Sequence, residues 1–306
     1  MSNKFKGAIL TTGGGICWGL SGSMGQFLFT HEGMDSRWLV PIRLFLAGLI
    51  LFFYCLFTCR DKLFSIWKHP RAAGLLLCYG LAGVTMCQYT YFRTIQLSSA
   101  GMGTILQDLS PAMILICSCI LMRRRPRVTE LISLVLAFVG ILLIITHGDF
   151  TALSISPHAL AVGIISAVGV TIYNMLTTPL AQDYPVPVLQ AWSFLLGGAL
   201  LFVLFRSWHI AYTPGPVGIF GIAFVVIVGN VLAFTAYISG VHKIGPNKGI
   251  LYGFAEPVTA AIISTTLLHS SFTVWDAIGF ACIFGMLVLI SISGKKDAPE
   301  ERTSEE

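Results

Sequence analysis

Residues 249–257 read Gly-Ile-Leu-Tyr-Gly-Phe-Ala-Glu-Pro, and they place a carboxylate and a proline inside a long apolar segment. A carboxylate at the depth of a lipid bilayer is costly, so it usually faces a cavity or a partner. Pro257 removes one backbone donor and frees a carbonyl near Gly253. Broken backbone is tolerated at that depth only where protein or a water-filled cavity covers it. The stretch therefore predicts a broken membrane helix with a functional carboxylate, Glu256, beside the break.

An earlier stretch, residues 103–111, repeats this outline as Gly-Thr-Ile-Leu-Gln-Asp-Leu-Ser-Pro. A shift of 146 positions (249 minus 103, and 257 minus 111) lays one stretch on the other and pairs Pro111 with Pro257. We interpret the chain as a duplication in which both prolines break a helix. The same shift brings further identical residues into register: Gly83 with Gly229, and Tyr91 with Tyr237.

The composition is that of a membrane protein. The chain has 306 residues, of which 55% are hydrophobic and 11% are charged, and its mean hydropathy is +0.81. Soluble domains are usually about 25% charged, so the sequence predicts a polytopic helical protein in a lipid bilayer. The net charge of +5 comes from basic residues between hydrophobic segments, which does not indicate a nucleic-acid partner. The eight cysteines lie in apolar segments without a Cys-x-x-Cys pair, so we expect no metal site and no cofactor.

Ten apolar segments approach the ~20 residues that a bilayer requires. Five of them fall in each half of the chain, and an odd number makes the second half begin on the opposite side of the membrane. We therefore predict an all-α polytopic membrane protein with ten transmembrane helices. The helices form two inverted five-helix repeats, residues 1–148 and 158–294, followed by a disordered cytoplasmic tail at 295–306. The expected spans are 7–29, 37–58, 72–95, 100–122, 128–147, 158–180, 186–206, 216–241, 249–268 and 274–294.

The basic residues predict the orientation. Most of the 19 lysines and arginines fall on one side of this arrangement, and only Arg37, Arg93 and Arg206 fall on the other. Cytoplasmic loops carry such an excess of positive charge. The sequence therefore predicts a multi-pass protein of the cytoplasmic (plasma) membrane whose two termini are both cytoplasmic.

Short motifs in the first, second, third, fourth and ninth spans give the chain a family resemblance. They are Trp18-Gly19, Arg43-Leu44, Tyr91-Phe92-Arg93, Ser110-Pro111 and Glu256-Pro257. With the ten-span layout, residues 7–294 resemble the drug/metabolite transporter superfamily, and within it the EamA-type permeases. The chain departs from the Gly-Glu pair that is common in that family after the fourth and ninth spans. The resemblance implies transport of small metabolites, often outward movement of amino acids or related solutes.

Asp108 and Glu256 are the only acids well inside the expected spans. At a rise of 1.5 Å per residue, they lie roughly 12 Å from the outer face and roughly 10 Å from the inner face, and so flank the midplane. A desolvated carboxyl group of this kind could also bind a coupling proton. We expect both acids to lie on a substrate path with other polar and aromatic side chains, namely Trp18, Ser21, Tyr91, Gln107, Tyr173, Asn174, Asn230, Tyr237 and Tyr252.

Some of these residues have a structural alternative. Arg43 lies at the depth of Asp108, so a structural Arg43–Asp108 ion pair competes with a substrate role for Asp108. Asn174 and Asn230 could each hydrogen-bond to a neighbouring helix instead of contacting a substrate. The sequence leaves these alternatives open.

The sequence favours a transporter over an enzyme or a sensor. Residues 19–22 match the Gly-x-Ser-Gly of rhomboid-type proteases, but a serine nucleophile needs a base within reach, and the seven histidines lie in loops or near span ends. A sensor would need a sizeable soluble domain, and every loop here is short. A lining with few cations suits an amino acid, a related zwitterion or an amine as the small-molecule substrate. We predict its transport by alternating access, with export as the expected direction. Coupling to a proton and assembly as a homodimer stay open.

Overall fold

The computed structural model describes residues 3–147 and 154–295, and over these residues the chain is helical without a β-strand. Apart from Lys295, the expected tail lies outside the described residues. The elements are α1 (Asn3–Thr30), α2 (Ser36–Thr58), α3 (Arg60–Ser65), η1 (Ile66–Lys68), α4 (Pro70–Leu77), η2 (Cys78–Thr85), α5 (Met86–Leu97), α6 (Ala100–Gln107), α7 (Ser110–Leu121), α8 (Val128–Thr146), α9 (Pro157–Ala181), α10 (Val186–Leu204), η3 (Ser207–His209), α11 (Pro216–Phe224), η4 (Val225–Leu232), α12 (Ala233–Ile244), α13 (Pro246–Gly253), α14 (Ala255–Thr266) and α15 (Val274–Lys295).

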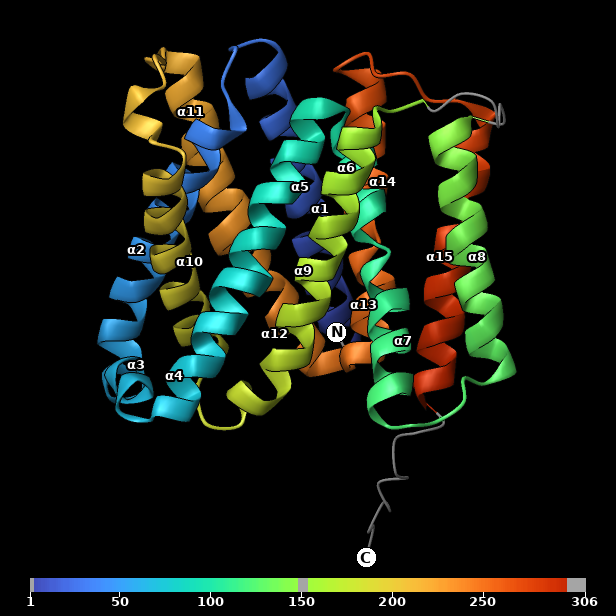
Figure 1. Ribbon diagram of the computed structural model, residues 1–306, viewed down its shortest axis with the longest axis horizontal. Helices are drawn as coiled ribbons and strands as arrows, with labels where there is room; N and C mark the ends of the chain where they lie inside the picture. The colour runs from blue at the N-terminus through green and yellow to red at the C-terminus, as the bar shows by residue number, and fades with distance from the viewer. Residues whose placement is uncertain (1–2, 148–153, 296–306) are drawn as a thin grey trace, which may run out of the picture.

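These elements join into ten rods that run along a common direction (Figure 1). Eight of the rods in the described chain are long and apolar enough to cross a membrane. The remaining two are α1 and the broken rod α13–α14, which the sequence also predicts as spans. The expected ten-span, all-α fold is therefore confirmed.

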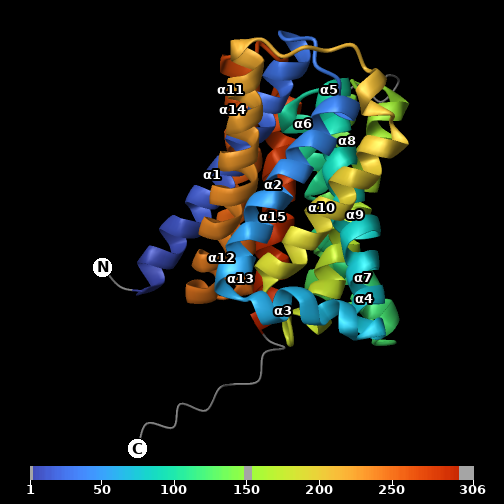
Figure 2. The same cartoon turned by 90° about the vertical axis from the view of Figure 1, so that its left-hand side faces the viewer.

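Helix α1 begins and α15 ends at the same end of the bundle (Figure 2). We call this the terminal end; it also carries the connections around residues 59–69 and 122–127. The opposite, or distal, end carries the connections at residues 31–35, 98–99 and 267–273. Because five rods precede α9, the second half starts from the distal end and runs inverted to the first.

The two halves pack around a centre of six rods. On one flank α2 packs on α10, and on the other α8 packs on α15, so each flank joins equivalent helices of the two halves (Figure 1). Between the flanks, α1 packs on α12 and α14, while α9 packs on α5 and α6. The six central rods are those that the sequence predicts to line a substrate path.

Two π-helical segments occur at matching places, which sequence patterns did not predict. They are η2 in the third rod and η4 in the eighth. Each contains a glycine that allows close packing: Gly83 lies against Tyr173, and Gly229 lies against Ser21. Segments of this kind are rare and concentrate at functional sites.

Glycines on one face of α1 bring its backbone close to the second half of the chain. A Cβ atom added at Gly14 would lie 2.8 Å from the carbonyl oxygen of Ala233, and one added at Gly15 would lie 3.0 Å from that of Gly253. A Cβ atom at Gly19 would lie 2.6 Å from the carbonyl oxygen of Glu256. Such small residues let membrane helices approach closely, so α1 is held against α12, α13 and α14.

Adjacent glycines offer a matched test of this contact. Gly14→Ala should lower the free energy of unfolding by about 1–3 kcal/mol, because the new methyl group overpacks the interface with α12. Gly13→Ala meets no atom within 4 Å and should be neutral or stabilising by up to about 1 kcal/mol, since alanine favours a helix. The measurement is thermal unfolding of the purified protein in detergent. Equal shifts in the two variants would contradict the packing described.

Candidate functional site

The ninth span is broken beside Glu256. Helix α13 ends at Gly253 and α14 begins at Ala255. Because Pro257 has no N–H group, the carbonyl of Gly253 lacks the donor it would have in an unbroken helix. The Glu256 carboxylate lies in the first turn of α14, where the positive end of a helix dipole favours a negative charge.

The fourth span has the corresponding break. Helix α6 ends at Gln107, and α7 begins at Ser110 with Pro111 in its first turn. Asp108 caps α6, and its backbone N–H donates to the carbonyl oxygen of Thr104 at 2.9 Å. Both interruptions occur next to the prolines that the sequence singles out.

Glu256 is contacted from the first half of the chain. The hydroxyl of Tyr91, on α5, donates to Oε1 of Glu256 at 3.4 Å. Two glycines leave room for this tyrosine: a Cβ atom at Gly22 would lie 2.6 Å from the Tyr91 hydroxyl, and one at Gly103 would lie 3.4 Å from its ring. The hydrogen bond therefore joins the two halves at the broken helix.

Asp108 lies in the same region but is not paired. Its Oδ2 atom is buried and has no hydrogen-bond partner in the part of the chain that the structure describes. Asp108 and Glu256 are close enough to interact electrostatically, so the two carboxylates repel one another when both are ionised. Beside them, Ser166 of α9 donates to Oε1 of Gln107 at 3.4 Å. A cation or a proton placed between the acids would relieve the repulsion.

Aromatic rings flank the two breaks. Trp18 and Tyr237 pack with their ring centroids 4.9 Å apart, and the ring of Tyr237 lies beside Gly253. Tyr173 packs against Tyr79 with ring centroids 6.3 Å apart. Several candidate side chains at the centre of the bundle keep part of their surface accessible, as a group that meets a solute requires: Trp18, Gln107, Asp108, Tyr173, Tyr237 and Glu256.

Four other predicted residues are placed differently. Asn174 is exposed, and its side-chain amide donates to the carbonyl oxygen of Val170 in its own helix at 2.9 Å. Tyr252 is 41% exposed. In the described chain, neither Asn174 nor Tyr252 forms a hydrogen bond with Asp108 or Glu256. Asn230 is buried with its Nδ2 atom unpaired in the described chain. Ser21 is buried against Gly229 in η4.

The Arg43–Asp108 ion pair, one of the two alternatives that the sequence left open for Asp108, is not formed in the described structure. Arg43 is fully enclosed, its guanidinium group donates to Oε1 of Gln88, and it lies 3.7 Å above the ring centroid of Phe92. No ion pair joins it to Asp108 within the described residues. The reason is the position of α2 in the plane of the membrane. Helix α2 carries Arg43 and packs on α5 and α10, so an equal depth does not make Arg43 and Asp108 neighbours.

Sequence reasoning missed several polar groups near the centre. Oε1 of Gln88 accepts a hydrogen bond from the Arg43 guanidinium group. Ser166 also donates to the carbonyl oxygen of Cys87 at 3.3 Å. Gln26 of α1 hydrogen-bonds to three other segments. Gln26 and Gln88 could have been found as polar residues inside apolar spans. A buried amide group requires hydrogen-bond partners, so such a residue indicates a contact with another helix.

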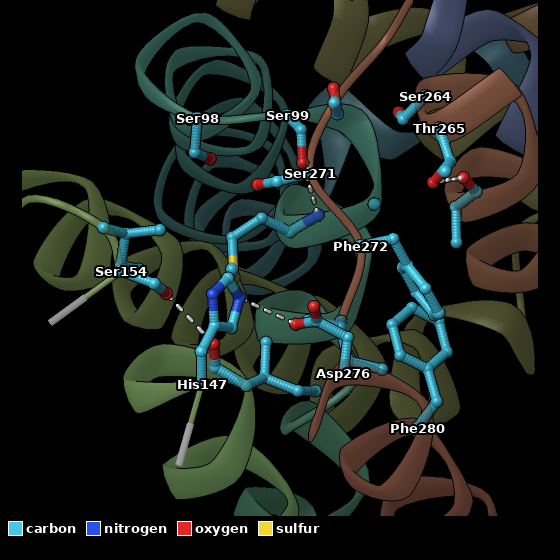
Figure 3. Close-up of a pocket in the computed structure, with 17 residues that line it drawn as sticks. Ser98, Ser99, His147, Ser154, Ser264, Thr265, Ser271, Phe272, Asp276 and Phe280 are labelled. Atoms are coloured by element: carbon cyan, nitrogen blue, oxygen red, sulfur yellow. Dashed lines mark hydrogen bonds and ion pairs between the residues drawn. The ribbon is translucent and has the colours of Figure 1, made fainter. Parts of the chain in front are cut away.

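A cavity of about 220 Å³ lies at the distal end, between α6 and α14 on one side and α8 and α15 on the other. Its wall is rich in hydroxyl groups, and His147 faces Asp276 across it (Figure 3). The two form an ion pair with Nε2 of His147 3.0 Å from Oδ1 of Asp276. In the described chain, no group of three or more His, Cys, Asp or Glu side chains could hold a metal ion.

Ten membrane rods in two inverted halves, with acidic side chains beside broken helices at the centre, define a membrane transporter. The EamA-like transporter family model matches residues 5–146 and again residues 158–292. The chain belongs to this family, which is part of the drug/metabolite transporter superfamily.

Relatives agree with this assignment, and one solved structure agrees with the fold. The chain is 33% identical over 298 residues to the uncharacterized inner membrane transporter YicL of Salmonella typhimurium, covering 97% of this chain and 99% of the relative. It is 25% identical over 267 residues to the uncharacterized transporter YyaM of Bacillus subtilis, covering 85% of each chain. A crystal structure that is 15% identical matches 96% of this chain and 99% of its own, with a TM-score of 0.63. This last likeness shows the fold alone.

The environment of Arg43 predicts which residues depend on each other. In double-mutant cycles, Arg43→Met with Gln88→Leu should show a coupling energy of about 0.5–3 kcal/mol, because the two side chains share a buried hydrogen bond. Arg43→Met with Asp108→Asn should be additive within about 0.5 kcal/mol. Thermal unfolding in detergent measures both cycles. Strong coupling to Asp108 without coupling to Gln88 would contradict the structure.

Proposed function

We propose that this protein exports a small amine or zwitterionic metabolite, such as an amino acid, across the cytoplasmic membrane by alternating access. The observation that carries the proposal is the position of Glu256. Its carboxylate lies beside a broken helix of the second half and accepts a hydrogen bond from Tyr91 of the first half. A group held between two halves is placed to sense a movement of one half against the other.

The charges around Glu256 favour a substrate with an ammonium group. Two carboxyl groups interact there, while the buried cation Arg43 donates to Gln88 and lies over the ring of Phe92. The rings of Trp18 and Tyr237 offer aromatic faces of the kind that attract an ammonium group. If the substrate also carries a carboxylate, that group would bind at the positive N-terminal end of a half-helix such as α7.

The proposed cycle uses the carboxyl group in two ways. Glu256 binds the substrate ammonium group when the path is open to one side and a proton, as the coupling ion, when it is open to the other. The glycine face of α1 permits the helices to slide without side-chain clashes. The two breaks and both acids belong to a single chain, so one copy suffices for the site.

Transport of the unknown substrate can be tested in two stages. Amino acids and amines are first profiled in the medium and in cells that overexpress or lack the protein. The solute that changes most is then offered to purified protein in liposomes. Glu256→Gln should reduce its transport roughly 10- to 100-fold at normal folded yield, because a charged hydrogen-bonding group contributes about 1.5–3 kcal/mol. Tyr91→Phe should have a smaller effect, of roughly 2- to 10-fold.

Asp61→Asn is the matched control, since Asp61 is an exposed acid at the terminal end, and it should transport as the unaltered protein does. The Glu256→Gln variant should also lose any dependence of transport on pH. Normal transport by this variant at every pH would overturn the proposed role of Glu256.

The direction of transport depends on the orientation, which the basic residues predict. Arg60, Lys62, Lys68 and Arg71 lie near the terminal end, as do Arg123 and its neighbours. Reporters fused to the N-terminus and to the C-terminus should therefore both be active only in the cytoplasm. A periplasmic or extracellular signal from either fusion would reverse the assignment.

A further inference from the structure

Gln26 ties three segments together near the distal end of α1. Its Oε1 atom accepts hydrogen bonds from the backbone N–H of Ala100, at the start of α6, at 2.7 Å and from the hydroxyl of Ser264, on α14, at 2.8 Å. Its Nε2 atom donates to the hydroxyl of Ser270, in the connection to α15, at 2.9 Å. The side chain is 3% exposed. All its hydrogen bonds are to residues distant in sequence, so it fixes a tertiary arrangement rather than its own helix.

The two broken spans pack tightly next to these hydrogen bonds of Gln26. A Cβ atom added at Gly101 of α6 would lie 3.3 Å from the Cα atom of Ala261 on α14, which leaves no room between the two helices at this point. Ile105 has no exposed surface, and Ile95 has 1%. Helices α6 and α14 are therefore in direct contact on the distal side of Glu256.

The hydroxyl-rich cavity lies directly beyond this contact. The side chains of its wall that carry a hydroxyl group include Ser98, Ser99, Ser264, Thr265, Ser270 and Ser271 (Figure 3). Ala261 is also part of the wall, and it follows Glu256 by five residues, or roughly 7.5 Å along α14. Two of the three partners of Gln26 therefore belong to the cavity wall.

We infer that this cavity is the outer vestibule of the transport path and that Gln26 is the latch that closes it off from Glu256. The inference rests on the proposed function, in which the distal end faces outward. The vestibule suits a solute that carries several hydrogen-bond donors and acceptors, because its lining offers hydroxyl groups while the side chains of His147 and Asp276 are engaged with each other. Opening requires α6 and α14 to separate, and this separation breaks the hydrogen bonds of Gln26.

A native cysteine reports on the opening. Cys87 lies on α5 one turn from Tyr91, is 3% exposed, and lies 3.9 Å from the hydroxyl of Ser166 beside the central acids. In this proposal, a membrane-impermeant thiol reagent added from outside reaches this sulfur atom when α6 and α14 separate. Cys87→Ser identifies the signal of this cysteine among the eight cysteines of the chain.

The experiment compares the rate at which Cys87 is modified from outside in cells that express the full chain. Gln26→Ala should raise this rate by at least about tenfold, and Ser264→Ala by roughly two- to tenfold, as expected for the loss of several hydrogen bonds and of one. Gln190→Ala is the matched control, because Gln190 is also buried and lies on α10, away from the cavity. It should leave the rate unchanged.

Equal rates in Gln26→Ala and the unaltered protein, at normal folded yield, would overturn the latch. An equal increase in Gln190→Ala would overturn it as well, since general loosening would then explain the result. If Gln26→Ala does not fold, Ser264→Ala decides by the same comparison. The assay uses no substrate, so a failed latch and a failed role of Glu256 in transport give separate results.

Discussion

The carbonyl group of Gly253 is the constraint around which the centre of this protein is built. Pro257 supplies no amide for it, and a lipid environment supplies no water. Helix α1 covers it: Gly15 passes so close that even a methyl group would touch the carbonyl oxygen. The same close approach brings Gly19 next to the backbone of Glu256. Covering the carbonyl that Pro257 deprives of its helical donor thus fixes the position of α1. Helix α1 in turn places Trp18 against Tyr237 and Gln26 against α14.

The two halves share a scaffold but not its charges. The shift of 146 positions that aligns the two breaks lays Asp108 on Phe254 and Ser110 on Glu256 (254 minus 108, and 256 minus 110). One acid therefore caps the helix before its break, and the other begins the helix after its break. The duplicated frame therefore gives the two breaks different electrostatic surroundings.

The spans and their breaks could be predicted because their signals are local. Hydropathy fixes a span, and a proline interrupts the helix that contains it, so α6, α7, α13 and α14 needed no knowledge of neighbours. Contacts between spans could not be predicted in the same way. The sequence gives the depth of a residue in the membrane but not its position within the membrane plane. Arg43 has the same depth as Asp108, yet its side chain donates to Gln88.

Other misses have the same origin. Gln26 meets Ser270 across 244 positions of sequence, and no short pattern encodes such a pairing. Asn174 bonds to its own helix because its face of α9 is exposed, which the apolar pattern of a membrane span conceals. The π-helical segments reflect packing of Gly83 and Gly229 against partners in other rods, so they too depend on tertiary structure.

The glycine face of α1 limits how the specificity of this carrier can be changed. Gly22 lies under Tyr91, and Gly25 lies under Phe92, each without room for another methyl group. Larger side chains on this face would displace the backbone before they reached a solute. For the proposed path, the positions to vary are therefore Tyr91 on α5, Tyr173 on α9 and Tyr237 on α12 rather than this face of α1. Helix α1 would then keep its position while side chains on the other helices are exchanged.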